Sequence, residues 1–228
     1  MIKPKPLWHS PLQVYYHIDR LTEQVGKKVI ESRGRYGFVQ ECRVGAVLAL
    51  CMFMQTGKPT YLQLHRPDPP DLFLMQISDS RKGQLDLMQV EVTSYLGVPE
   101  EDLLTQLKRT KLPEGWHKYS SRYILLTHLG IGFEVNYRPI SNYLKLNKSP
   151  FPLMVIQEIQ EYPDTISALD ILDPEWHRLE INVGEAAYRF KQLKLPDLLR
   201  TVRVGDPKKV GIERNAHIKD VTPWESLI

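Results

Sequence analysis

Two acidic residues, Asp71 and Glu91, are the best candidates in this chain for catalytic chemistry. They lie 20 residues apart, which is enough for one strand, a turn and a returning strand that bring the two carboxylates close together. Hard cations such as Mg²⁺ bind oxygen ligands, usually one or two carboxylates together with water and a substrate phosphate. A cation held in this way activates water and stabilises the charge on a reacting phosphate. The spacing therefore predicts a site for Mg²⁺ or Mn²⁺.

Three further residues are candidates for the same site. Glu41, at the start of the preceding predicted helix, could be a third metal ligand or could position a metal-bound water. Gln89 and Thr93 alternate with apolar residues in one strand, so they share a face with Glu91 and could orient the attacking water. The candidate catalytic residues are Asp71, Glu91, Gln89 and Thr93, and the candidate metal ligands are Asp71, Glu91 and Glu41.

The strand that carries Glu91, predicted over residues 85–95, has the strongest β pattern in the chain. Such an apolar strand is expected inside a sheet, where a charged side chain is costly unless it is paired or bound to metal. This cost is the physical reason for assigning a function to Glu91. Two plainer interpretations stay open: Glu91 could face solvent on a half-exposed strand, and Asp71 could simply end the proline-rich turn before it.

The remaining elements follow from hydrophobic periodicity and from turn residues. Helices are predicted over residues 12–32, 38–55 and 99–108, and residues 1–10 are predicted to be an arm. Strands are predicted over residues 61–65, 71–77, 122–129, 151–159, 165–172 and 178–190, with 185–190 as an alternative helical turn. Residues 194–204 are predicted to contain a helix or a strand.

The order of these elements and motifs resembles the PD-(D/E)xK nuclease superfamily, whose fold is called restriction-endonuclease-like. The matching residues are Glu41 in a helix, Pro70-Asp71 at the start of a strand and Glu91-Val92-Thr93 in the next, within residues 38–129. The resemblance implies an α/β fold in which a central mixed sheet is flanked by helices. That core would span about residues 36–145 of a single domain, 1–228, with a strand-rich C-terminal extension over about 150–228. The implied activity is metal-dependent hydrolysis of DNA phosphodiesters.

Thr93 departs from the family pattern, because it stands where the family has a lysine. Threonine cannot supply the positive charge of an ammonium group. Three possibilities stay open. Lys108 or Lys82 could replace the missing lysine, or Gln89 and Thr93 could orient water without a charge. Alternatively, the site is inactive and the fold serves as an interaction module for nucleic acid or protein.

Composition narrows the remaining function classes. The net charge of +3 over 228 residues permits a DNA partner without requiring one. The cysteine and histidine spacings do not match a zinc site, and the chain has no P-loop or dinucleotide fingerprint. The longest apolar run, residues 44–54, is shorter than a membrane span. We therefore expect a cytoplasmic protein without a membrane partner. Its C-terminal segment could form a homodimer surface, a sheet extension or a partner site.

Overall fold

A computed structural model describes eleven segments of the chain: residues 7–26, 37–64, 70–79, 84–95, 101–112, 123–130, 132–147, 153–158, 166–172, 177–203 and 210–213. The helices are α1 (Pro11–Val25), α3 (Gly37–Thr56), α4 (Leu103–Thr110), α5 (Tyr137–Leu146) and α6 (Val183–Gln192). The strands are β1 (Leu7–His9), β2 (Thr60–Leu64), β3 (Leu72–Asp79), β4 (Gln84–Tyr95), β5 (Tyr123–Leu129), β6 (Leu153–Glu158), β7 (Ile166–Leu172), β8 (His177–Asn182), β9 (Leu198–Arg203) and β10 (Val210–Glu213).

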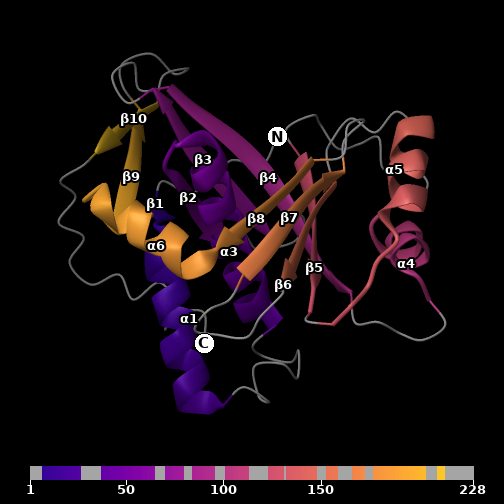
Figure 1. Cartoon of the computed structure of the whole chain (residues 1–228). Helices are drawn as coiled ribbons and strands as arrows, with labels where there is room; N and C mark the ends of the chain where they lie inside the picture. The colour runs from indigo at the N-terminus through magenta and orange to yellow at the C-terminus, as the bar shows by residue number, and fades with distance from the viewer. Residues whose placement is uncertain are drawn as a thin grey trace.

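The described strands form one mixed sheet of ten strands in the order β10-β9-β1-β2-β3-β4-β5-β6-β7-β8. Strand β5 runs parallel to both β4 and β6, and the other neighbours are antiparallel. Figure 1 shows α1, α3 and α6 on one side of the central strands and α4 and α5 on the other. The protein is therefore an α/β protein with a helical layer on each face of a mixed sheet, as expected.

Helix α3 lies at the centre of the larger core. It contacts β2, β3 and β4, then β7 and β8, and it also packs against α1 and α6. Its sequence is apolar around most of its circumference, and such a helix is stable only when it is buried on most sides. Although α3 is long and apolar enough to cross a membrane, 72% of its apolar stretch is buried inside the protein, as in the core helix of a globular domain.

A close contact at Gly45 fixes the position of α3 on the sheet. A Cβ atom at Gly45 would lie 2.3 Å from Leu72 Cδ1 and 3.6 Å from Leu62 Cδ1. The missing side chain therefore allows α3 to approach β2 and β3 more closely than any other residue would. Leu72 is fully buried and directly follows Asp71, so this contact also positions the start of β3.

A second apolar cluster joins α4 and α5 to the opposite face of the sheet. Leu107 of α4 and Leu144 of α5 are buried in it together with Leu125 of β5 and Leu153 of β6. On β5, the side chain of Ile124 belongs instead to the α3 cluster. The alternation of β5 therefore separates the two cores, which is why this strand is apolar on both faces.

Several elements differ from the sequence-based expectation. The predicted arm contains β1, which pairs with β2 and β9, and α5 was not predicted at all. The first helix ends at Val25, where Gly26 has a φ of 87°, and the rest of its predicted span lies outside the described residues. The segment predicted as one strand over 178–190 divides into β8 and α6, and residues 198–203 form β9. The C-terminal segment extends the sheet, which is one of the three roles left open for it.

The Gly45 contact predicts that Gly45→Ala destabilises the protein. Alanine favours a helix over glycine by at most about 1 kcal/mol, whereas overpacking a buried site typically costs about 1–3 kcal/mol. We expect a net loss of about 1 kcal/mol in the free energy of unfolding, measured by denaturant titration. Leu72→Val removes the atom involved in the clash, so the double variant should be more stable than the sum of the single effects indicates. Strict additivity would contradict the contact.

The buried His9 predicts a component of stability that is lost in acid. Burial lowers the pKa of His9 from 6.5, although its contact with the Gln13 side chain, 2.9 Å from Nδ1, acts in the opposite direction. The unfolded chain therefore binds a proton that the folded chain does not, so stability decreases as the pH falls below 6.5. We expect His9→Gln to make the free energy of unfolding less dependent on pH in this range. Equal pH dependence in the two proteins would refute the prediction.

Candidate functional site

Asp71 and Glu91 lie on neighbouring strands in the interior of the sheet. Leu72 pairs with Val90, so the antiparallel register brings Asp71, the preceding residue, alongside Glu91. Both carboxylates are buried, with 5% and 7% of their residues exposed. Asp71 Oδ2 accepts a hydrogen bond of 2.6 Å from the backbone N–H of Val92. The aspartate thus connects the start of β3 to the part of β4 that carries the glutamate.

Two side chains bind Glu91 on the side of the sheet that α4 and α5 cover. Its Oε2 accepts a hydrogen bond of 3.0 Å from the hydroxyl of Tyr123. Its Oε1 forms an ion pair with Nζ of Lys111. The flanking Val90 and Val92 belong to the α3 core, so the alternation predicted for β4 is correct. A cation and a hydroxyl therefore compensate the cost of burying this carboxylate.

Lys111 places an ammonium group beside Glu91. It lies immediately after α4, where its backbone N–H donates to the carbonyl of Leu107, and its side chain is 22% exposed.

Lys108, one of the predicted replacements, instead has its Nζ 4.5 Å from the ring centroid of Tyr143 on α5. The other, Lys82, lies outside the described residues. Sequence reasoning missed Lys111 because it ended the helix at residue 108, two residues before α4 ends at Thr110.

The other candidates lie on β4 itself and on α3. Gln89 and Thr93 are half-buried, two residues to either side of Glu91, and Thr93 pairs with Thr127 of β5. Glu41 is half-buried on α3, the helix that covers the opposite face of β4. Within the described residues, no three His, Cys, Asp or Glu side chains form a group that could hold a metal. The metal-binding roles of these residues stay predictions.

Two carboxylates at neighbouring positions of a sheet suit a divalent cation that has few protein ligands. An ionised carboxylate offers about four acceptor positions, and on Glu91 the hydroxyl of Tyr123 and the ammonium group of Lys111 occupy two of them. Mg²⁺ is commonly bound by one or two carboxylates and retains several waters. Asp71 and Glu91 could therefore hold Mg²⁺ or Mn²⁺ together with water and substrate oxygens.

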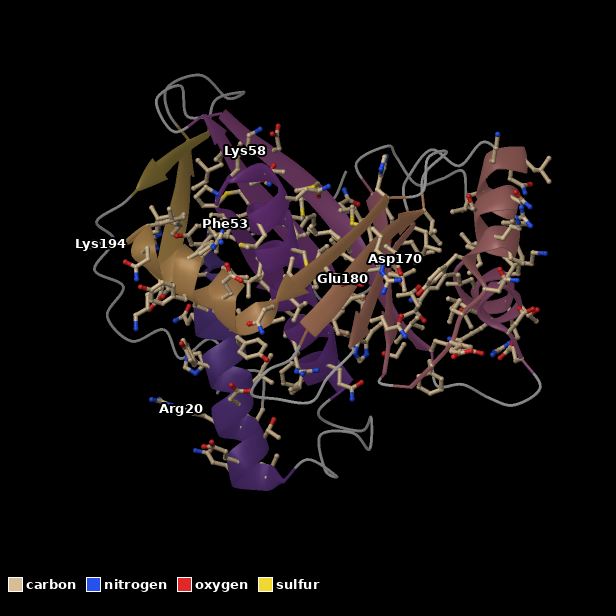
Figure 2. The ribbon with its side chains drawn as sticks, viewed as in Figure 1. Arg20, Phe53, Lys58, Asp170, Glu180 and Lys194 are labelled. Carbon is tan, nitrogen blue, oxygen red and sulfur yellow. The ribbon has the colours of Figure 1, made fainter. Side chains whose placement is uncertain are left out.

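A third buried carboxylate, Asp170, lies on the same face of the sheet as Glu91 and was not predicted. It is fully buried on β7, with Arg178 Nε of β8 3.6 Å from its Oδ1. Figure 2 shows Asp170 on the side of β7 that faces α4 and α5. Burial, and then the negative charge of Asp170, raise the pKa of Tyr137, the first residue of α5. This pair lies where α5 begins on the sheet, and the only sequence signal for it was an aspartate within an apolar strand.

Comparison of the chain with family models, with curated proteins and with solved structures finds no significant match.

The Glu91–Lys111 pair predicts a measurable coupling between the two residues. Lys111→Met leaves the glutamate buried without its cation. Removing one partner of a fully buried ion pair lowers the free energy of unfolding by about 3–5 kcal/mol. Because Lys111 is partly exposed, we expect a loss of about 1–2 kcal/mol in the free energy of unfolding. The double variant Lys111→Met/Glu91→Gln should recover part of this loss. Lys145→Met, an exposed lysine on α5, is the control, and an equally small effect at both lysines would refute the coupling.

Proposed function

We propose that this protein is a metal-dependent nuclease that hydrolyses DNA phosphodiesters. The observation that carries the proposal is the register that places the buried Asp71, directly before β3, opposite the buried Glu91 of β4, with Lys111 bound to the glutamate. A buried carboxylate pair with a nearby ammonium group provides ligands for a cation and a positive charge for a phosphate. Lys111, immediately after α4, would supply the positive charge that the family's lysine supplies and that Thr93 lacks.

The order of elements around the pair supports a restriction-endonuclease-like core. Helix α3 precedes the antiparallel strands β2, β3 and β4, helix α4 follows, and β5 then runs parallel to β4. Helices α3 and α4 lie on opposite faces of the sheet (Figure 1). Asp71 stands at the start of the second of these strands and Glu91 within the third, which are the positions that the resemblance implies.

Each polar residue of the site has a role in this proposal. Asp71 and Glu91 would hold the divalent cation, which makes a bound water more acidic and stabilises charge on the phosphate. Lys111 would place its ammonium group beside the phosphate oxygens, and Gln89 and Thr93 would orient the water. In the reaction, the water oxygen forms a bond to phosphorus while the bond from phosphorus to one sugar oxygen breaks. The products are a phosphate monoester end and a hydroxyl end.

One observation favours a second function, an inactive nuclease-like protein that binds nucleic acid or protein. Both oxygens of Glu91 already have a donor, Lys111 on one and Tyr123 on the other. A glutamate neutralised in this way is stable without metal, and the described residues offer no third acidic ligand.

The nuclease proposal predicts metal-dependent cleavage of plasmid DNA that depends on both carboxylates. We expect Asp71→Asn and Glu91→Gln each to reduce the cleavage rate by at least about 100-fold, because each removes a ligand of a site with few ligands. Asp86→Asn changes an exposed aspartate on the same strand and should cleave like the unchanged protein. Cleavage by Asp71→Asn at the full rate would show that the assignment is wrong.

A calorimetric titration with Mn²⁺ distinguishes the two functions. The nuclease proposal predicts binding that Asp71→Asn and Glu91→Gln weaken, together with cleavage in the presence of Mn²⁺. Absence of both metal binding and cleavage in a protein that remains folded would support the inactive alternative.

A further inference from the structure

Helices α4 and α5 form the outer layer beside the proposed site, and this layer is rich in positive charge. The segment from Leu103 to Leu112 and the helix α5 contain no acidic residue. Their cations are Lys108, Arg109, Lys111, Arg138 and Lys145. We call the exposed side of these two segments the α4/α5 face. Because the whole chain has a net charge of only +3, the rest of it is net acidic.

Three described acidic residues lie close in sequence to these segments: Glu101, Asp102 and the exposed Glu134, which lies three residues before α5. Glu101 forms an exposed ion pair of 2.9 Å with Arg109. Asp102 is the N-cap of α4 and accepts from the backbone N–H of Thr105. Among the described residues, the ion pairs of this face join Arg109 to Glu101 and Lys111 to Glu91 of the proposed site, while Arg138 and Lys145 are exposed on α5.

The exposed cations of α5 lie along one stripe of the helix. Arg138 and Lys145 are seven residues apart, so they share a face about 10 Å apart along the axis, and the exposed Asn142 lies between them. Successive phosphates of one DNA strand rise about 3.4 Å along the duplex. The stripe thus spans about three phosphate steps, and both cations and the amide are suitable donors to phosphate oxygens.

Helices α4 and α5 contact each other through one side-chain pair and share one apolar cluster. The ammonium group of Lys108 lies over the ring of Tyr143, and the aliphatic residues below them form one cluster. Lys111, at the end of α4, extends from this layer to Glu91 within the sheet. Lys111 therefore connects this helical layer to one carboxylate of the proposed site.

We propose that the α4/α5 face binds the phosphate backbone of the DNA substrate and directs one strand toward Asp71 and Glu91. The choice of DNA as the partner rests on the proposed nuclease function, while the location of the surface rests on the charge and the geometry of the two helices. Arg138, Asn142 and Lys145 contact phosphates without reading the sequence. Lys111 contacts the phosphate nearest the carboxylates.

The test compares two double variants that remove the same charge from opposite sides of the protein. Arg138→Gln/Lys145→Gln changes the α4/α5 face, and Lys191→Gln/Lys194→Gln changes exposed residues of α6 and the turn after it, far from α5 in the views of Figures 1 and 2. Binding of a short fluorescent DNA duplex is measured by anisotropy at several salt concentrations, with a chelator present to prevent cleavage. We expect the first variant to weaken binding about 10-fold or more and to reduce the salt slope by about two, one per lost phosphate contact. The second should bind like the unchanged protein.

Several outcomes would overturn the inference. These are no DNA binding by the unchanged protein, equal binding by the α5 variant, and equal losses in both variants. Binding of phosphatidylserine vesicles that the α5 variant loses, while its DNA binding is unchanged, would instead identify a membrane surface. The two proposals fail separately. If cleavage depends on Asp71 but the α5 cations do not affect binding, only the surface is wrong, and the reverse result rejects only the nuclease.

Discussion

The enclosure of α3 by the sheet is the constraint on which the rest of the structure depends. A helix that is apolar on nearly all sides cannot be buried by one flat layer, and here strands β2 to β4 contact it together with β7 and β8, while α1 and α6 cover what remains. Closing the core around α3 therefore requires strands from both halves of the chain. Because Gly45 lies in close contact with Leu72, the position of α3 also fixes the position of Leu72 and of the adjacent Asp71.

The two faces of the sheet have different chemistry. The α3 face is filled by aliphatic and aromatic side chains, whereas the opposite face holds Glu91 with Lys111 and Tyr123, and Asp170 with Arg178. Glu91 and Asp170 each have a cation that is itself partly exposed, which reduces the desolvation cost that a fully buried pair would carry. These cations, Lys111 after α4 and Arg178 on β8, connect the buried charge of this face to the surface.

Much of the architecture could be predicted from local pattern, because α3 and strands β2 to β5 have strong periodicity and clear turn residues. The same reasoning brought Asp71 and Glu91 onto adjacent strands and put Glu91 on the correct face of β4. It could not find Lys111, whose partner lies 20 residues away and becomes visible only when α4 packs on the sheet. It also missed β1, because three residues form a strand only when β2 and β9 supply hydrogen bonds on both sides. Hydrophobic periodicity and turn residues predict elements of secondary structure. They do not predict whether Asp71 and Glu91 bind a metal ion, because that depends on the affinity of the folded site.

The pairing of β1 with β9 has a consequence for how the chain folds. Leu7 lies opposite Arg200, and Ser10 donates its backbone N–H to the carbonyl of Asp197 at 2.7 Å, so nearly the whole chain forms the loop that these contacts close. Loop closure of this length carries an entropic cost before it gains any pairing energy. During synthesis, one edge of β1 therefore stays unpaired until β9 has left the ribosome. Strand β1, which is made before the other described strands, is therefore among the last to be completed.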